Sequence, residues 1–146
     1  TGVFEGNVTV TRDQTEIIAT SMEGDFDEEL YQFSGDVILK KEREEETGTS
    51  TIIWKAPTLT YNGETEEARS ENGSDIVWKE TTIKTDRAVY FPKDDEKNQL
   101  ERIEMEGEIL ITEKERELQV GKAVYYLDSE TLEAEKIIKA KFILGD

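Results

Sequence analysis

Apolar and polar residues alternate along most of this chain, and three stretches do so around a glycine. Residues 4–10, 33–39 and 105–111 each begin with an apolar residue, reach glycine two positions later and continue with apolar residues at every second position. Alternation with a period of two predicts a strand with one buried face. A glycine inside a strand marks a bulge, a bend or a close backbone approach. We therefore expect these strands to turn a corner at their glycines.

The spacing of these glycines indicates a structural repeat. Gly6 and Gly35 are 29 residues apart, whereas Gly35 and Gly107 are 72 apart, which leaves room for a degenerate copy between them. Units of this size that recur along a chain usually stack on their neighbours and share one core. We therefore predict a single elongated all-β domain over residues 1–146.

A second short motif follows these strands after polar hairpins. Copies occupy residues 17–22, 56–61, 85–90 and 120–125, with a looser copy at 134–137. In most of them a small or apolar residue is followed by another three positions later, and three copies end in tyrosine. An offset of three breaks the alternation of a strand, which predicts a β-bulge at the intervening polar pair. Ordinary variation within a meander is the alternative.

Turn signals recur at short intervals and predict strands of about five to nine residues throughout. Asn-Gly pairs at 62–63 and 72–73 are the strongest of these signals, because Asn-Gly between alternating apolar runs favours a tight hairpin. The acidic segment 40–50 is the longest polar interruption, and we expect it to form a protruding, mobile hairpin loop. Residues 129–141 have helical propensity, but their apolar residues continue the register of the repeat, so we predict a strand there.

Composition and charge narrow the class of function. Hydrophobic residues make up 35% of the chain and charged residues 36%, a balance that suits thin sheets with one solvated face. The formal net charge of −17 would repel nucleic acid and anionic bilayer surfaces, so we expect no nucleic-acid partner. An acidic surface is also typical of proteins from saline habitats. The charge alone therefore does not show whether the acidic excess reflects the function or the habitat.

The chain lacks residue types that catalysis and metal binding commonly use. The chain has no histidine and no cysteine, which excludes zinc sites and thiol nucleophiles and removes the commonest general base. Carboxylate pairs can perform acid and base catalysis, but among 35 acidic residues such pairs arise by chance. The acidic runs at 25–29 and 94–96 lack the spacing of a calcium loop. We therefore predict no enzyme activity, no cofactor and no metal.

The ends of the chain and its lack of cysteine bear on its compartment. Because the chain has no cysteine, its composition does not distinguish an oxidising compartment from a reducing one. The chain has no apolar run of about 18 residues and no signal peptide. It begins at Thr1, already inside a strand pattern, and we expect that an export signal or membrane anchor has been removed.

Strict alternation places a set of large apolar residues on one face of the predicted sheet. Each would ordinarily fill a core. Together they could instead line a long groove for acyl chains, where burial of each methylene contributes about 0.8 kcal/mol. A filled core and an open groove both fit this pattern. The predicted groove residues are Phe4, Val8, Val10, Phe33, Val37, Leu39, Trp54, Leu59, Tyr61, Trp78, Ile83, Tyr90, Ile103, Met105, Ile109, Ile111, Leu118, Val120, Tyr125 and Ile137.

The repeated motifs also resemble a known family. Residues 4–11, followed by 17–19, resemble the opening of the OstA-like repeat of the LptA family of lipopolysaccharide transport proteins. Residues 35–39, 85–90 and 122–125 resemble further copies, so the likeness covers nearly the whole chain. Each motif is short and degenerate, and their order and number carry the resemblance. The alanine-aspartate dipeptide of the family is altered to Ala19-Thr20, Ala56-Pro57 and Thr85-Asp86.

The resemblance implies both a fold and a function. The implied fold is an open, twisted β-jellyroll built from repeated antiparallel strand pairs. The implied function is a periplasmic carrier that moves lipopolysaccharide from the inner to the outer membrane, with the acyl chains in an apolar groove. The implied partners are an inner-membrane transporter complex and an outer-membrane translocon, joined through edge-strand pairing. Unpaired edges recruit strands, so we expect head-to-tail homo-oligomers through residues 3–10 and 139–144.

Two kinds of alternative remain open. Within the family, the chain could be an LptC-like periplasmic domain of the inner-membrane complex, because we expect that the N-terminal segment that would separate LptC from LptA has been removed. An N-terminal domain of the translocon is a third possibility. Outside the family, a structural or adhesive repeat protein with a filled core is the main competitor. Phosphorylated headgroups would remain in solvent, near Lys122, Lys136, Lys139 and Lys141, although a solvated cationic edge explains these lysines as well.

Overall fold

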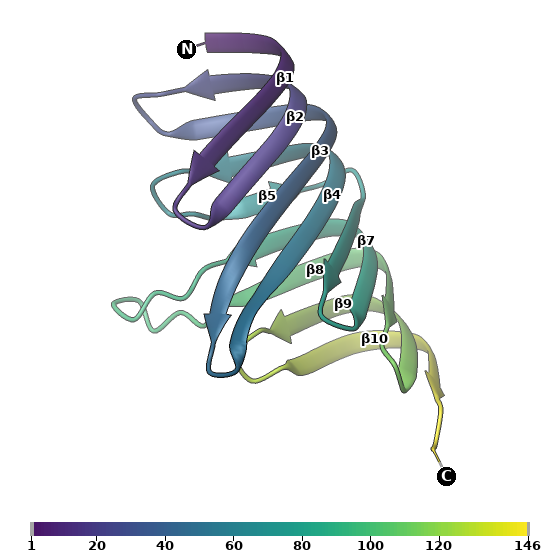
Figure 1. Ribbon diagram of the computed structural model, residues 1–146. Helices are drawn as coiled ribbons and strands as arrows, with labels where there is room; N and C mark the ends of the chain where they lie inside the picture. The colour runs from purple at the N-terminus through teal and green to yellow at the C-terminus, as the bar shows by residue number, and fades with distance from the viewer. Residues whose placement is uncertain (1, 146) are drawn as a thin grey trace.

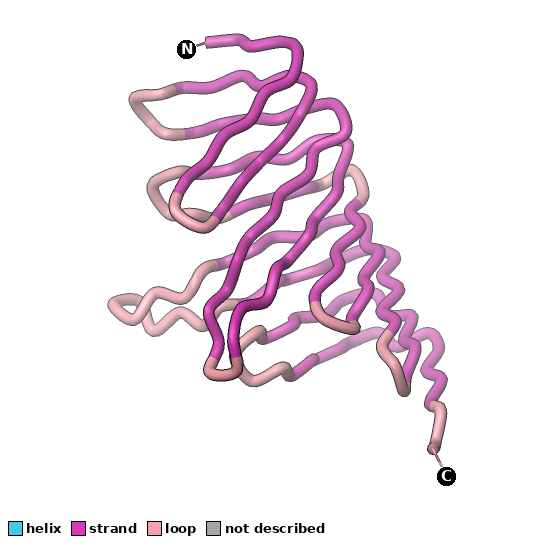
Figure 2. Tube along the Cα trace, in the orientation of Figure 1, coloured by secondary structure: helices cyan, strands magenta, loops and turns pink. Residues whose placement is uncertain are grey.

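The computed structural model describes residues 2–145, which form strands and turns (Figures 1 and 2). Thr1 and Asp146, the two ends of the predicted domain, lie outside these residues. No helix in the described part is long and apolar enough to span a membrane. The strands are β1 (Gly2–Arg12), β2 (Thr15–Asp25), β3 (Leu30–Glu45), β4 (Gly48–Asn62), β5 (Ala68–Ser70), β6 (Ser74–Trp78), β7 (Thr81–Phe91), β8 (Arg102–Thr112), β9 (Arg116–Tyr126) and β10 (Thr131–Phe142).

All ten strands belong to one antiparallel sheet that follows the order of the chain. The sheet runs β1-β2-β3-β4-β5-β7-β8-β9-β10, and β6 also lies between β4 and β7. Each long strand curls over midway, so the sheet folds along a line that crosses its strands (Figure 1). The expected all-β fold of repeated antiparallel strand pairs is confirmed, as is the strand predicted over residues 129–141. The predicted strand length of about five to nine residues is wrong for every strand except β6, because the long strands continue through the bend and reach 11 to 16 residues, whereas β5 has only 3.

The bend line consists of β-bulges in register across the sheet. The pairing shifts after Glu5 in β1, after Ser34 in β3 and after Glu106 in β8, in each case at the glycine of the repeat. Gly35 and Gly107 adopt φ angles of +82° and +108°, in the region that favours glycine. The prediction that these strands turn a corner at their glycines is therefore confirmed.

The extra residue of each bulge lies on the glycine-containing strand, which corrects the position predicted from the second motif. On β3 the buried residues Phe33 and Val37 are four positions apart across the bend, whereas on β4 Ala56 and Leu59 are three apart. The second motif thus supplies a single residue opposite a two-residue bulge, in this case Pro57. Its offset of three reflects the shorter side of the bulge.

The degenerate copy expected between Gly35 and Gly107 is the pair of short strands β5 and β6. Both lie between β4 and β7, so they form one strand position that is interrupted at residues 71–73. Gly73 adopts a φ of +99°, and its N–H donates to the carbonyl of Asp86 at 2.8 Å. The hairpin predicted at residues 72–73 is therefore wrong. Asn-Gly favours a positive φ, and here a bend within a strand position requires it.

The hairpin predicted over residues 40–50 is confirmed, but the long loop expected within it is wrong. Strand β3 continues to Glu45 and β4 begins at Gly48, so only a two-residue turn separates them. The reason lies in packing, because Arg43 is 7% exposed and lies over the ring of Trp78, with 5.2 Å between Cζ and the ring centroid. A charged residue in this polar segment is therefore part of the packed structure.

The fold produces two walls that face each other across one core. Wall A comprises the strand segments that contain residues 2–5, 21–25, 30–34, 58–62, 68–70, 87–91, 102–106, 122–126 and 131–135. Wall B comprises the segments that contain residues 8–12, 15–18, 37–45, 48–56, 74–78, 81–85, 109–112, 116–120 and 139–142. The walls join at the bend line, and the turns of both walls meet on the opposite side, which we call the mouth.

Candidate functional site

The space between the walls is filled by the predicted apolar stripe. Sixteen of the twenty predicted groove residues are buried, none of them more than 6% exposed. They form one cluster that also includes Ile17, Ile52, Ile76 and Leu127, which the prediction missed. Ile52 and Ile76 alternate with Trp54 and Trp78, so strict alternation could have identified them. In the described structure the interior is thus a packed core that runs the length of the sheet.

The other four predicted residues lie at the two ends of this core. Phe4 on β1 is 45% exposed and Ile137 on β10 is 60% exposed, while Val8 and Val10 are half-buried against the cluster. Ile137 pairs with the fully buried Val120, so it belongs to the inner face of its strand. The apolar interior therefore continues to both edges of the sheet and is open to solvent there.

Ion pairs join the two walls across the mouth. Arg12 Nη1 lies 2.7 Å from Glu29 Oε1, and Lys79 Nζ lies 2.6 Å from Glu130 Oε1. Arg12 and Lys79 lie at the turn ends of wall B, and both glutamates lie in turns of wall A. These pairs are about half exposed and therefore individually weak.

Arg43 forms the buried centre of this row. Its Nε donates to Glu101 Oε1 at 2.7 Å and its Nη2 donates to Asp128 Oδ1 at 2.9 Å, from wall B to wall A. Burial alone would lower the pKa of the Arg43 guanidinium, but the hydrogen bond to Glu101 and the two carboxylate charges raise it overall. The hydroxyl of Tyr90 donates to the other oxygen of Glu101. Arg43 is thus held charged in a nearly closed site.

The three tyrosines that end copies of the second motif lie on wall A just inside the mouth. Trp78 of wall B packs edge-on against Tyr125, with 5.7 Å between the ring centroids. Burial raises the pKa of Tyr61 to about 12 and also raises the pKa of Tyr125. Burial, together with the charge of Glu101, raises the pKa of Tyr90 further. These rings stay neutral and seal the core below the ion pairs.

We predict that the protein loses stability at alkaline pH through these tyrosines. A raised pKa in the folded state means that the neutral phenol is favoured, so the stabilisation is complete below the ordinary tyrosine pKa of about 10 and is lost as the pH rises through the folded value. For Tyr61 this window lies between about 10 and 12. Denaturant unfolding at pH values across this window measures the loss, which Tyr61→Phe should reduce. An equal loss in that variant would contradict the assignment.

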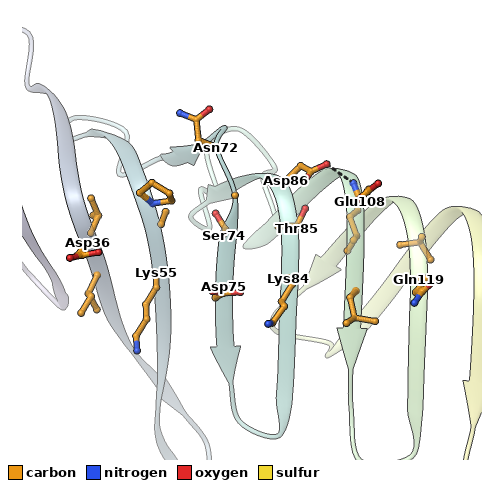
Figure 3. Close-up of a pocket in the computed structure, with 18 of the residues that line it drawn as sticks. Asp36, Lys55, Asn72, Ser74, Asp75, Lys84, Thr85, Asp86, Glu108 and Gln119 are labelled. Carbon is orange, nitrogen blue, oxygen red and sulfur yellow. Dashed lines mark hydrogen bonds between the residues drawn. The ribbon is translucent and has the colours of Figure 1, made fainter.

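A broad trough of about 1220 Å³ lies outside the core, on the outer face of wall B beside the bend line (Figure 3). Lys55 and Lys84 extend into it from β4 and β7, alongside Asp75 of β6 and Gln119 of β9 (Figure 3). Only three of the predicted groove residues, Val37, Ile109 and Val120, touch this trough, and all three are themselves buried. This trough is therefore lined by both polar and apolar residues and is distinct from the apolar interior.

The lysines predicted to meet headgroups are spread from the bend line toward the turn end of wall B. Lys139 and Lys141 pair with Gln119 and Glu117, both on wall B, and Lys122 and Lys136 lie close to the bend line. All four side chains are exposed. The cations at the mouth were missed, because nothing in the local pattern of the sequence distinguishes them. Within residues 2–145, no group of three or more acidic side chains is arranged to hold a metal ion.

Comparison with known proteins identifies the fold as LptA-like. No family model matches the chain, and no curated protein matches its sequence. The chain is similar to the solved structure of LptH from Pseudomonas aeruginosa, described as the LptA homologous periplasmic component of the conserved lipopolysaccharide transport device. The TM-score is 0.67 at 14% identity, over 90% of this chain and 95% of that chain. The fold expected from the family resemblance is therefore confirmed.

Proposed function

We propose that this protein is a periplasmic component of lipopolysaccharide transport that carries the lipid by its acyl chains between walls A and B. The observation that supports this proposal most directly is the apolar interior, which is continuous from Phe4 to Ile137 and open at both ends. LptH, which has a similar fold, is a component of such a transport device. Within this proposal the protein performs no chemistry, so a separate transporter must supply the energy.

The filled interior requires that the walls separate when acyl chains bind. Core side chains such as Phe33 and Val37 are 0% exposed, so a chain can lie between them only where their contacts are replaced by contacts with the lipid. Apolar surface that passes from protein contact to acyl contact stays out of water, which keeps the cost of this exchange low. The bend line allows such movement, because bulges interrupt the ladder there.

Photocrosslinking in cells that make lipopolysaccharide tests the proposed function. A photoreactive residue at Val37 or Ile109 would lie on the inner face of wall B, among the residues proposed to contact acyl chains. Lipid adducts from both positions are expected. The competing function, a structural or adhesive repeat protein, is favoured by the packed interior and predicts no adduct from either position.

We further propose that the protein joins its partners, including other copies of itself, through its two edge strands. Within residues 2–145, β1 and β10 each pair with a neighbour on one side. The sheet has nine strand positions, and all neighbouring strands are antiparallel, so β1 and β10 run in the same direction. A head-to-tail contact that continues both walls must therefore pair β10 with β1 in parallel. An LptC-like role would use the same edges.

We predict concentration-dependent oligomers that depend on the inner face of β10. Ile137→Glu should reduce assembly, because it places a charge where the apolar interior would continue into the next copy. Ile138→Glu is the matched control, since Ile138 is 72% exposed but lines the outer trough. Sedimentation over a range of concentrations measures the effect. A wild-type protein that stays monomeric, or equal effects of the two variants, would contradict the proposal.

A further inference from the structure

The ion pairs across the mouth are arranged with one sign of charge on each side. Arg12, Arg43 and Lys79 belong to wall B. Their partners on wall A are all carboxylates, namely Glu29, Glu101, Asp128 and Glu130. These residues are far apart in the chain, so none of the contacts helps to form a local turn or to pair neighbouring strands.

This row of charges lies on the side of the core opposite the bend line. Contacts there connect the free ends of the two walls, whereas the bulges connect their bases. Breaking the row would let the walls separate without breaking the strand ladder. Most of these pairs are partly exposed and weak, and only the Arg43 centre is buried.

We infer that this row of ion pairs is a clasp that must open for acyl chains to load sideways through the mouth. The inference rests on the proposed function and specifies how its site is reached. Opening separates the carboxylates of wall A from the cations of wall B, so Arg12 and Arg43 lose their closest partners and can pair with another anion, while Lys79 keeps Glu45 of wall B as a partner. A lipid with an anionic headgroup and its chains in the core would place that headgroup at the mouth.

The clasp also explains how a strongly acidic protein could bind a lipid with an anionic headgroup, as proposed above. The overall charge of −17 repels a phosphorylated lipid at a distance. At the opened mouth, however, the headgroup would meet Arg12 and Arg43, whose closest carboxylate partners have moved away with the other wall. Guanidinium groups bind phosphate through two parallel hydrogen bonds, which suits Arg43 for this exchange.

A covalent lock across the mouth tests the clasp. The chain contains no cysteine, so a double variant Lys79→Cys and Glu130→Cys can be joined selectively by a short bismaleimide linker across the two walls. The matched control joins Lys79→Cys to Glu45→Cys, because Lys79 Nζ lies 2.7 Å from Glu45 Oε2 and both residues belong to wall B. Each protein is then mixed with a pyrene-labelled dodecyl phosphate, and the association rate is followed by fluorescence.

We expect the cross-wall lock to slow probe association at least tenfold relative to the same-wall link. Reducing the linker length should not change the rate of the control. Equal rates in the two linked proteins would overturn the inference, because the chains would then load through an end of the core. If the same-wall protein and the unlinked protein both bind no probe, the proposed function itself fails. Far-ultraviolet circular dichroism of both linked proteins confirms that the sheet is intact.

Discussion

Replacing Gly35 with alanine is expected to destabilise the protein by about 3 kcal/mol, from a positive φ and a steric clash together. Gly35 lies at φ +82°, and a Cβ there would lie 2.6 Å from Cβ of Thr20 on the neighbouring strand. Neither β2 nor β3 can move away, since both are central strands with partners on each side. Denaturant unfolding of the purified variant measures the change.

Gly6 provides the matched control for this prediction. It occupies the equivalent bulge on β1 at φ +102°, but no atom lies within 4 Å of the position of an added Cβ. Gly6→Ala should therefore cost only the backbone strain, about 1 kcal/mol. Adding Thr20→Gly should restore part of the stability lost in Gly35→Ala. Equal losses at the two glycines would show that the clash with Thr20 is not what requires glycine at the central bulge.

Between β9 and β10, next to the register shift at Ile138, the glycine and the residue with positive φ lie on different strands. On β10 the residue with positive φ is Lys136, at +57°, rather than a glycine. Opposite it on β9 stands Gly121, and a Cβ there would lie 3.1 Å from Cβ of Lys136. At this position the glycine that makes room for the neighbouring side chain therefore lies on the strand opposite the residue with positive φ.

Replacing Arg43 with methionine is the second change with a large expected effect, a loss of about 3 kcal/mol, because it leaves a buried carboxylate without its partner. Glu101 is 8% exposed and accepts hydrogen bonds from both Arg43 and Tyr90. Methionine keeps most of the packing against Trp78, so the loss of stability measures the effect of leaving the Glu101 carboxylate without its cation. Chemical unfolding at neutral pH measures it.

Two comparisons isolate the buried charge in this second prediction. Adding Glu101→Gln to Arg43→Met should recover much of the stability, since the remaining amide can still accept from Tyr90 and carries no charge. Arg87→Met should cost less than about 0.5 kcal/mol, because the ion pair of Arg87 with Glu106 is half exposed on both sides. If Arg43→Met were as mild as Arg87→Met, the cluster at the mouth would not hold the walls together.

The sequence predicted the bend line and the inner face of the sheet because both arise from local patterns. Alternation identifies the inner face of each strand, and a glycine within a strand identifies the bulge, as at Gly35 and Gly107. The mouth could not be predicted in this way. Arg43 is 58 residues from Glu101 and 85 from Asp128, so the cluster exists only after the sheet has folded over. For the same reason the acidic segment around Arg43 was mistaken for a loop.

The mistaken hairpin at residues 72–73 has a different physical cause. Asn-Gly reports that the backbone needs a positive φ, but it does not report whether the chain then reverses or continues. Here the chain continues from β5 into β6, because both strands find partners in β4 and β7. Tertiary pairing therefore decided between two structures that the local sequence allows equally.

Photocrosslinking from neighbouring residues on opposite faces of wall B tests the central claim most directly. Val37 and Ile109 are buried on the inner face and only border the outer trough, whereas Ile38 and Leu110, the next residues along each strand, are partly exposed in it. The same photoreactive residue is placed at each position in cells that make lipopolysaccharide. We predict lipid adducts from positions 37 and 109 and none from 38 and 110. Adducts from the outer positions alone, or from none of the four, would contradict a carrier that holds acyl chains between its walls.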